Sequence, residues 1–389
     1  MANTLTNLIP DIYAALDVVS RELVGFIPAV ARDSTADRLA INQTLRVPVA
    51  PSNAAVGNIT PAMTIPAASD QTITNKTITI SKQRFAPFSW TGEEQKAMDY
   101  GPGFLTLKQY QIAQALRALV NEVETDLATA AYKSASRAYG TSATTPFGST
   151  LADTANLKKI LDDNGAPATD RQLIIDTTAG VNLRLLTQLT KVNEAGTSAT
   201  LRQGTLLDVH NFGIRESAQI VTATAGTMAN ATTDGANHAV GATSLALATA
   251  GTGIVAAGDV IALANDSANK YVVTGATFAG ANPAVGDTIT IGAPGLRKAT
   301  TAVTRAITVS ATGARNVAFT RNSIFLATRL PAIPAEGDLA SDRMTVTDPN
   351  SGLSFEFALY PGFRMNVYHV SACWGYSVIK EAHVAVLLG

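Results

Sequence analysis

The chain has 389 residues, of which 46% are hydrophobic, 15% charged and 6% aromatic. A sequence this apolar and this weakly charged can bury a core, so disorder is excluded, and the length predicts two or three domains. The 29 basic and 30 acidic residues give a net charge of −1, which provides no basic field for specific nucleic-acid binding. The single cysteine, Cys373, excludes an intrachain disulfide framework.

The first 24 residues have an amphipathic pattern. Apolar residues recur every three or four positions from Leu8 to Leu23, which predicts a short helix within residues 5–24. Its apolar face packs either on its own domain or on a neighbouring subunit, and the sequence leaves both open. The segment has no basic region of the kind that begins an export signal, so we expect synthesis in a reducing cytoplasm.

Residues 45–90 are predicted to form a long two-stranded arm. Several prolines interrupt its first half, and residues 72–80 alternate β-branched side chains in the manner of a strand. No obvious hydrophobic face is present, and an isolated hairpin is only marginally stable in water. We therefore expect the arm to lie against another copy of the chain.

One long helix is predicted over residues 104–138, which contain no glycine or proline. At 1.5 Å per residue it would be about 50 Å long. Its apolar stripe consists of Ile112, Leu116, Leu119, Val123, Leu127 and Ala130. We expect this stripe to pack on β strands of the last 45 residues. We expect the acids Glu122, Glu124 and Asp126 to form a solvated or intersubunit face that is free to slide.

Residues 153–221 are predicted to alternate helices and strands. The pattern favours a helix around 157–161, a buried strand at 172–176 and a helix around 181–189. Residues 316–329 resume a helical pattern, and the last 45 residues are predicted to be β strands. Together these segments indicate a mixed α/β domain that is completed from the C-terminal part of the chain.

Residues 222–309 differ sharply in composition from their surroundings. They contain only eight charged and two aromatic residues, with short β patterns such as residues 260–263 and 288–291. Short strands separated by glycine-rich turns indicate a small barrel or sandwich. The longest uncharged run, residues 235–258, is built from small and polar residues, so we expect no membrane span. The segment is interpreted as a β domain inserted into the mixed domain.

No motif for metal binding or phosphate binding is found. Asp162–Gly165 lacks the alternating ligands and the closing Glu of a calcium loop, and is predicted to be a helix-ending turn. Gly251–Gly258 has the wrong spacing for a dinucleotide fingerprint and is predicted to be a turn. No metal-ligand spacing relates the histidines to one another or to Cys373; they are His210, His238, His369 and His383.

No catalytic arrangement is found either. Asp208, His210 and Ser217 are close in sequence but lack the glycine-flanked elbow that exposes a nucleophilic serine. The acids of the long helix lack the Glu-x-x-His pattern of di-iron bundles. We therefore expect no catalytic residue, no cofactor-binding residue and no metal ligand, and we expect that the protein is not an enzyme.

The order of these segments resembles the major capsid (coat) proteins of tailed double-stranded DNA bacteriophages. Within that family it looks like the branch with an inserted β-barrel domain, typified by the coat proteins of short-tailed phages. Local similarities lie at residues 213–217 just before the insertion, at 316–331 just after it and at 373–388 near the end. The resemblance spans nearly the whole chain.

The resemblance implies an α+β fold, the tailed-phage major capsid fold, with an inserted small all-β domain. The expected parts are an N-terminal arm (1–44), an extended β arm (45–95), a spine-helix peripheral domain (96–150), an axial domain in two parts (151–221 and 310–345), the insert (222–309) and closing β strands of the peripheral and axial domains (346–389). The implied function is a structural protein that self-assembles into the icosahedral head shell around the phage genome.

The implied partners are other copies of the chain, in hexamers and pentamers, a scaffolding protein during assembly and a portal protein at one vertex. A decoration protein and non-specific proximity to packaged DNA complete the set, and no membrane or cofactor is implied. The location is the virion, after assembly in the host cytoplasm. Lys76 and Lys82 are the only loop lysines placed for the cross-link of some family members, and we expect no cross-linking.

Three alternatives come from other classes. An encapsulating nanocompartment protein would share the fold without a reason to carry the insert. A surface-layer protein or adhesin would suit the Ala/Thr-rich composition but should carry an export signal and repeats. An enzyme would need a site that is absent. Electron microscopy of the purified protein would separate these classes.

Overall fold

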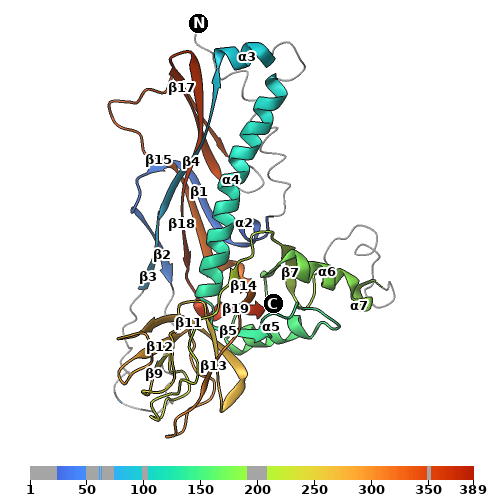
Figure 1. The fold of residues 1–389 in the computed structure, drawn as a ribbon, viewed down its shortest axis with the longest axis vertical. Helices are drawn as coiled ribbons and strands as arrows, with labels where there is room; N and C mark the ends of the chain where they lie inside the picture. Colours follow the sequence, from blue (N-terminus) through green and yellow to red (C-terminus); the bar gives the residue numbers. More distant parts are fainter. Residues whose placement is uncertain are drawn as a thin grey trace.

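The chain folds into an elongated α+β molecule in which a long helix connects two large sheets (Figure 1). The computed structural model describes residues 24–49, 61, 63, 74–98, 104–190, 208–347 and 352–389. The helix predicted within residues 5–24 lies outside these residues except for Val24. In the described part, no helix is long and apolar enough to cross a membrane.

The first sheet has six strands, with the long helix α4 (Phe104–Lys133) along one face (Figure 1). β18 lies at its centre. Strand β4 pairs along one edge of β18, and strands β17 and β15 pair one after the other along its opposite edge. β1 adds in parallel to β15, and β16 adds antiparallel to β17. The strands are β1 (Ala31–Leu39), β4 (Lys82–Thr91), β15 (Ile324–Pro331), β16 (Asp342–Thr347), β17 (Ser354–Gly362) and β18 (Met365–Val378).

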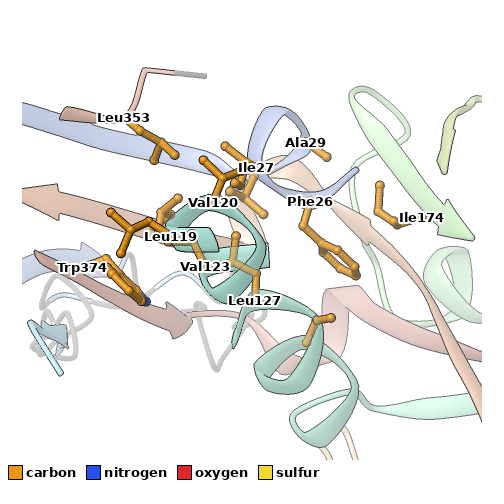
Figure 2. Packing of buried hydrophobic residues seen from close by; sticks show 14 of the residues in the cluster. Phe26, Ile27, Ala29, Leu119, Val120, Val123, Leu127, Ile174, Leu353 and Trp374 are labelled. Atoms are coloured by element: carbon orange, nitrogen blue, oxygen red, sulfur yellow. The ribbon is translucent and has the colours of Figure 1, made fainter. Parts of the chain in front are cut away.

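The apolar stripe of α4 packs on this sheet. Ile112, Leu116, Leu119, Val123 and Leu127 are each at most 3% exposed, and they share one core with alternate residues of β18 such as Val370 and Trp374. Figure 2 shows Leu119 of the helix near Trp374. Side chains alternate across a strand, so every second residue of β18 faces the helix. The predicted packing on the closing strands is confirmed. The helix ends at Lys133 rather than at residue 138 because residues 137–140 pair as strand β5.

The hairpin arm, residues 44–79, contains the antiparallel strands β2 (Thr44–Val49) and β3 (Thr74–Thr79). Contrary to the sequence interpretation, its base has an apolar face. Ile78 is buried, and together with Leu45 it packs against Ala327 and Cys373 of the six-stranded sheet. A Cβ on Gly375 would lie 2.1 Å from Thr79 O, so this glycine allows β3 to approach β18.

The second sheet follows the order β13-β10-β11-β5-β19-β14-β6-β7. Its last five strands, together with three helices, form what we call the α/β lobe, with a core that includes Leu161, Leu173 and Leu387. Two pairs in the lobe are parallel, β6 with β7 and β5 with β19. The elements are β5 (Arg137–Gly140), α5 (Ala152–Asp163), β6 (Arg171–Ile175), α6 (Thr177–Leu185), α7 (Thr187–Thr190), β7 (Phe212–Glu216), β14 (Gly313–Thr320) and β19 (Val384–Leu388).

Residues 222–309, the insert, enclose a separate core that includes Leu245, Ile261 and Ile289. The runs 260–263 and 288–291 form strands where the sequence predicts them. The insert also extends the host sheet, because Lys270 and Tyr271 of β11 pair with β5. Its strands are β8 (Thr222–Ala223), β9 (Ser244–Ala246), β10 (Val260–Leu263), β11 (Asp266–Thr277), β12 (Thr288–Ile291) and β13 (Ile307–Val309).

The helix predicted over residues 316–329 is wrong. The chain forms β14, a 3₁₀ turn at Arg321–Ser323 and β15. Both strands are buried along nearly their whole length, so neither shows the alternation of apolar and polar residues that marks a half-exposed strand. Further short helices are α2 (Phe26–Ala29), α3 (Gly92–Met98) and a 3₁₀ turn at Glu381–His383.

Candidate assembly site

The candidate catalytic residues Asp208, His210 and Ser217 do not form one site. His210 Nδ1 lies 2.8 Å from Thr154 Oγ1, whereas Ser217 Oγ donates to Glu124 Oε1 at 2.9 Å. Asp208 is exposed. Because the histidine and the serine have different partners, they do not form a proton relay with each other.

The acidic run at residues 162–165 ends a helix. Asp162 accepts a hydrogen bond from Arg171 Nη2 at 2.6 Å, and Asp163 pairs with Arg137 Nη2 at 3.2 Å. Gly165 has a φ of +71°, the left-handed conformation that commonly follows the last helical residue. Within the described ranges, no group of three or more His, Cys, Asp or Glu residues is arranged to hold a metal ion.

Two acids of α4 (Phe104–Lys133), which we call the spine helix, connect it to β4, the strand that leads out of the hairpin arm. Lys82 of β4 donates to Glu122 Oε1 at 2.9 Å and to Asp126 Oδ1 at 2.8 Å. Asp126 Oδ2 also accepts from the Trp374 indole N–H at 2.9 Å. Burial opposes the charged form of Glu122, but its bonds to Lys82 and Arg84 outweigh this and lower the pKa of its carboxyl. These acids bind their own subunit, so the prediction that they slide freely is wrong.

The third acid, Glu124, is 1% exposed, which contradicts its assignment to a solvated or intersubunit face. Its carboxylate accepts hydrogen bonds from three backbone N–H groups, those of Gly25, Phe26 and Ile27, and from Ser217 Oγ. Burial raises the pKa of this carboxyl, although the four donors act in the opposite direction. The sequence carried one usable signal: Glu124 is four residues from both Val120 and Ala128, which are buried on the same helix.

Lys82 and Lys76, the two candidate cross-linking residues, lie in different environments. The Lys82 ammonium is bound by the two carboxylates of α4. Lys76 is exposed on β3, and so is Arg46 on β2. The two described strands of the arm therefore carry positive charge, from Arg46 and Lys76, and contain no acidic residue. The absence of cross-linking stays a prediction.

Large apolar side chains are exposed at several separate places. Phe363, at the tip of the β17–β18 hairpin, is 92% exposed, and Leu185 on α6 is 71% exposed. Figure 1 places β17 and α3 at one end of the molecule and α6 on the α/β lobe, away from that end. Beside Phe363 is an open cavity of ≈ 640 Å³, lined in part by Trp90, Glu93 and Arg364.

No protein-family model matches the sequence, and no curated protein matches it. Solved structures are similar over nearly the whole chain at low sequence identity. The capsid structure of the cyanophage P-SCSP1u is 13% identical, with 95% of this chain and 88% of that chain covered and a TM-score of 0.49. The capsid of a native GTA particle is 10% identical, with 94% and 90% covered and a TM-score of 0.45.

A virus-like particle from Pyrococcus furiosus is 9% identical to the chain, with 97% of this chain and 98% of that chain covered and a TM-score of 0.42. Sequence identity this low assigns no role to an individual residue. The function is therefore inferred from the residues and the geometry of the chain itself.

Proposed function

We propose that this chain is a major capsid protein that self-assembles into the icosahedral head shell around a phage double-stranded DNA genome. The observation that carries the proposal is the hairpin arm. Its base packs on its own subunit through Ile78 and Leu45, while Arg46, Lys76 and Thr77 farther along the two strands are exposed. A two-stranded ribbon is marginally stable by itself, so a neighbouring subunit is the natural support for the outer part of the arm.

The separate exposed apolar sites support the same proposal. A subunit of a closed shell contacts several neighbours through different surfaces. Phe363 at the sheet tip, Leu185 on the α/β lobe and Val285 in the insert are each more than two-thirds exposed, at 92%, 71% and 82%. They belong to three different parts of the fold, which suits a subunit with neighbours on several sides.

The proposal extends to partners and location. Copies of the chain form hexamers and pentamers, with a scaffolding protein during assembly, a portal protein at one vertex and a decoration protein as further partners. The subunit is assembled in the host cytoplasm and becomes part of the virion. Its role is structural and not enzymatic, and residues 222–309 are a domain inserted into the α/β lobe.

Electron microscopy and analytical sedimentation test the proposal. The purified protein, co-expressed with a scaffolding protein, should form closed shells, sheets or tubes. Replacing residues 50–73 by a short Gly-Ser linker leaves β2, β3 and the packed base in place, so the monomer melt should be unchanged while shells are lost. If the unaltered protein stays a monomer or dimer at high concentration, the proposal fails.

Limited proteolysis provides a second test. Residues 48–77 should be cut in the free monomer and protected in shells, because the neighbouring subunit covers them there, whereas the packed base at Ile78 should resist cleavage in both states. Equal protection in both states would contradict an intersubunit arm. Closed shells that form without scaffolding and take up a cargo protein would favour a nanocompartment instead.

A further inference from the structure

The carboxylate of Glu124 joins three parts of the chain that are remote in sequence. Oε1 accepts the N–H groups of Gly25 and Phe26, both at 2.6 Å, and the Ser217 hydroxyl at 2.9 Å; Oε2 accepts the Ile27 N–H at 3.0 Å. Glu124 is on the spine helix, Gly25–Ile27 form the root of the N-terminal segment, and Ser217 follows β7 of the α/β lobe. No ion pair of this carboxylate is found in the part of the chain that the structure describes.

The backbone donors need this acceptor. The first N–H groups of a helix have no acceptor within the helix, and a side chain just before it usually supplies one. α2 begins at Phe26, and Gly25 before it has no side chain to serve as the cap. Glu124 fills that role from 98 residues away along the chain.

Gly25 cannot be exchanged for a capping residue. A Cβ at this position would lie 2.7 Å from Ile174 Cγ2 and 2.9 Å from Glu216 O, so the chain passes here in direct contact with β6 and the end of β7. Phe26 lies parallel to Phe319, with ring centroids 6.1 Å apart. Figure 2 shows Phe26 and Ile27 beside the Val123 and Leu127 side of α4.

We propose that Glu124 is a latch whose hydrogen bonds fix the root of the N-terminal segment to the spine helix and to the α/β lobe. Its hydrogen bonds are 2.6–3.0 Å long, and such bonds weaken steeply when stretched or bent. The root therefore moves with α4 as one body. Under the proposed function, in which the chain before this root belongs to the N-terminal arm (1–44), the latch makes the direction of that arm depend on the position of the spine helix.

Amide hydrogen exchange of the monomer tests the latch directly. Glu124→Gln places an amide N–H₂ group where one carboxylate oxygen accepted, so one or more of the Gly25, Phe26 and Ile27 amides loses its acceptor. Exchange at these amides should rise by roughly tenfold or more. Glu122→Gln is the matched control, because it makes the same change two residues away and should leave these amides unaffected.

Ser217→Ala is the second variant, used in case Glu124→Gln does not fold. It removes the Ser217 donor and leaves the three backbone bonds in place, so exchange at Gly25–Ile27 should rise by less than tenfold. In the unaltered protein these three amides should be protected as strongly as the core of α4. The latch is overturned if they exchange rapidly in the unaltered protein, or if a folded Glu124→Gln protein protects them equally well.

The size and shape of assembled shells provide a second readout, which separates failure of the latch from failure of the proposed function. If the unaltered protein forms shells, Glu124→Gln should give shells of altered size or open tubes, while Ser217→Ala gives a milder change. Normal shells from a folded Glu124→Gln protein would remove the role of the latch in assembly. If the unaltered protein forms no shells, the proposed function fails, and the exchange data still decide whether the latch exists.

Discussion

Replacing Ile78 by alanine should open the base of the hairpin arm and expose the thiol of Cys373. Ile78 is 1% exposed on β3 and belongs to a small core with Ile80, Ala327 and Cys373. Cys373 is the only cysteine of the chain, and it is 0% exposed. Its reactivity therefore reports on whether this one core is open.

The size of the effect follows from the packing. Truncating a fully buried isoleucine to alanine costs roughly 2–5 kcal/mol, because apolar contacts are lost and a cavity remains. If that cost falls on a local opening of the arm base, labelling should accelerate by roughly 30- to 4,000-fold, since 1.4 kcal/mol is a factor of ten. Burial raises the pKa of the Cys373 thiol to about 12. The closed form therefore holds almost no reactive thiolate at neutral pH.

The assay is the rate of reaction with a chromogenic disulfide reagent under native conditions, alongside a urea melt. Ile289→Ala is the matched control, because Ile289 is 0% exposed in the separate core of the insert. It should lower stability comparably without accelerating the labelling of Cys373. Labelling of the Ile78 variant no faster than that of the unaltered protein would refute the assignment of this core. Equal acceleration by both variants would show that the arm base opens only when the whole subunit unfolds.

Three further expectations concern the subunit. Leu119→Ala should lower the free energy of unfolding of the monomer by roughly 2–5 kcal/mol in a denaturant melt, and an unchanged melt would contradict the packing of α4. Asp126→Asn should cost roughly 1–3 kcal/mol, since Asp126 accepts from Lys82 and Trp374 through two different oxygens and Asn keeps only one acceptor oxygen; a neutral result would show that neither bond matters. Residues 222–309 expressed alone should give a β-type circular dichroism spectrum and a cooperative melt, because they enclose their own core; a disordered fragment would show that the contact with β5 is required.

The parts of the fold that the sequence predicts well are those with local patterns. The start of α4 at residue 104 and its buried stripe follow from helical spacing without glycine or proline. The strands at 260–263 and 288–291 follow from short β-branched runs between turn residues. In each case one segment contains the whole signal: helical spacing for α4, and a short run of apolar residues bounded by turn residues for the two strands.

The failures share a non-local cause. β14 and β15 are covered on both faces, so their sequences have no period of two and were interpreted as helix. The spacing of Glu124 from Val120 and Ala128 indicates that it is buried, but its partners are backbone N–H groups near residue 26, which leave no trace in a sequence. The apolar base of the arm becomes visible only when Cys373, almost 300 residues later, is placed beneath Ile78.

Charged residues of the spine helix, and of strand β5 that follows it, make polar contacts with each of the other parts of the subunit. Asp126 binds the strand that leaves the hairpin arm, and Glu124 binds the N-terminal root. Arg137, just beyond the helix, is 3% exposed and donates to Asn269 of the insert and to Asp163 of the α/β lobe. A buried charge adds little net stability but is costly to leave unpaired, so these contacts fix position more than they add to stability. Under the proposed function, a subunit that presents several surfaces to its neighbours requires such fixed positions, and the helix, about 45 Å long, provides the common reference along which they are placed.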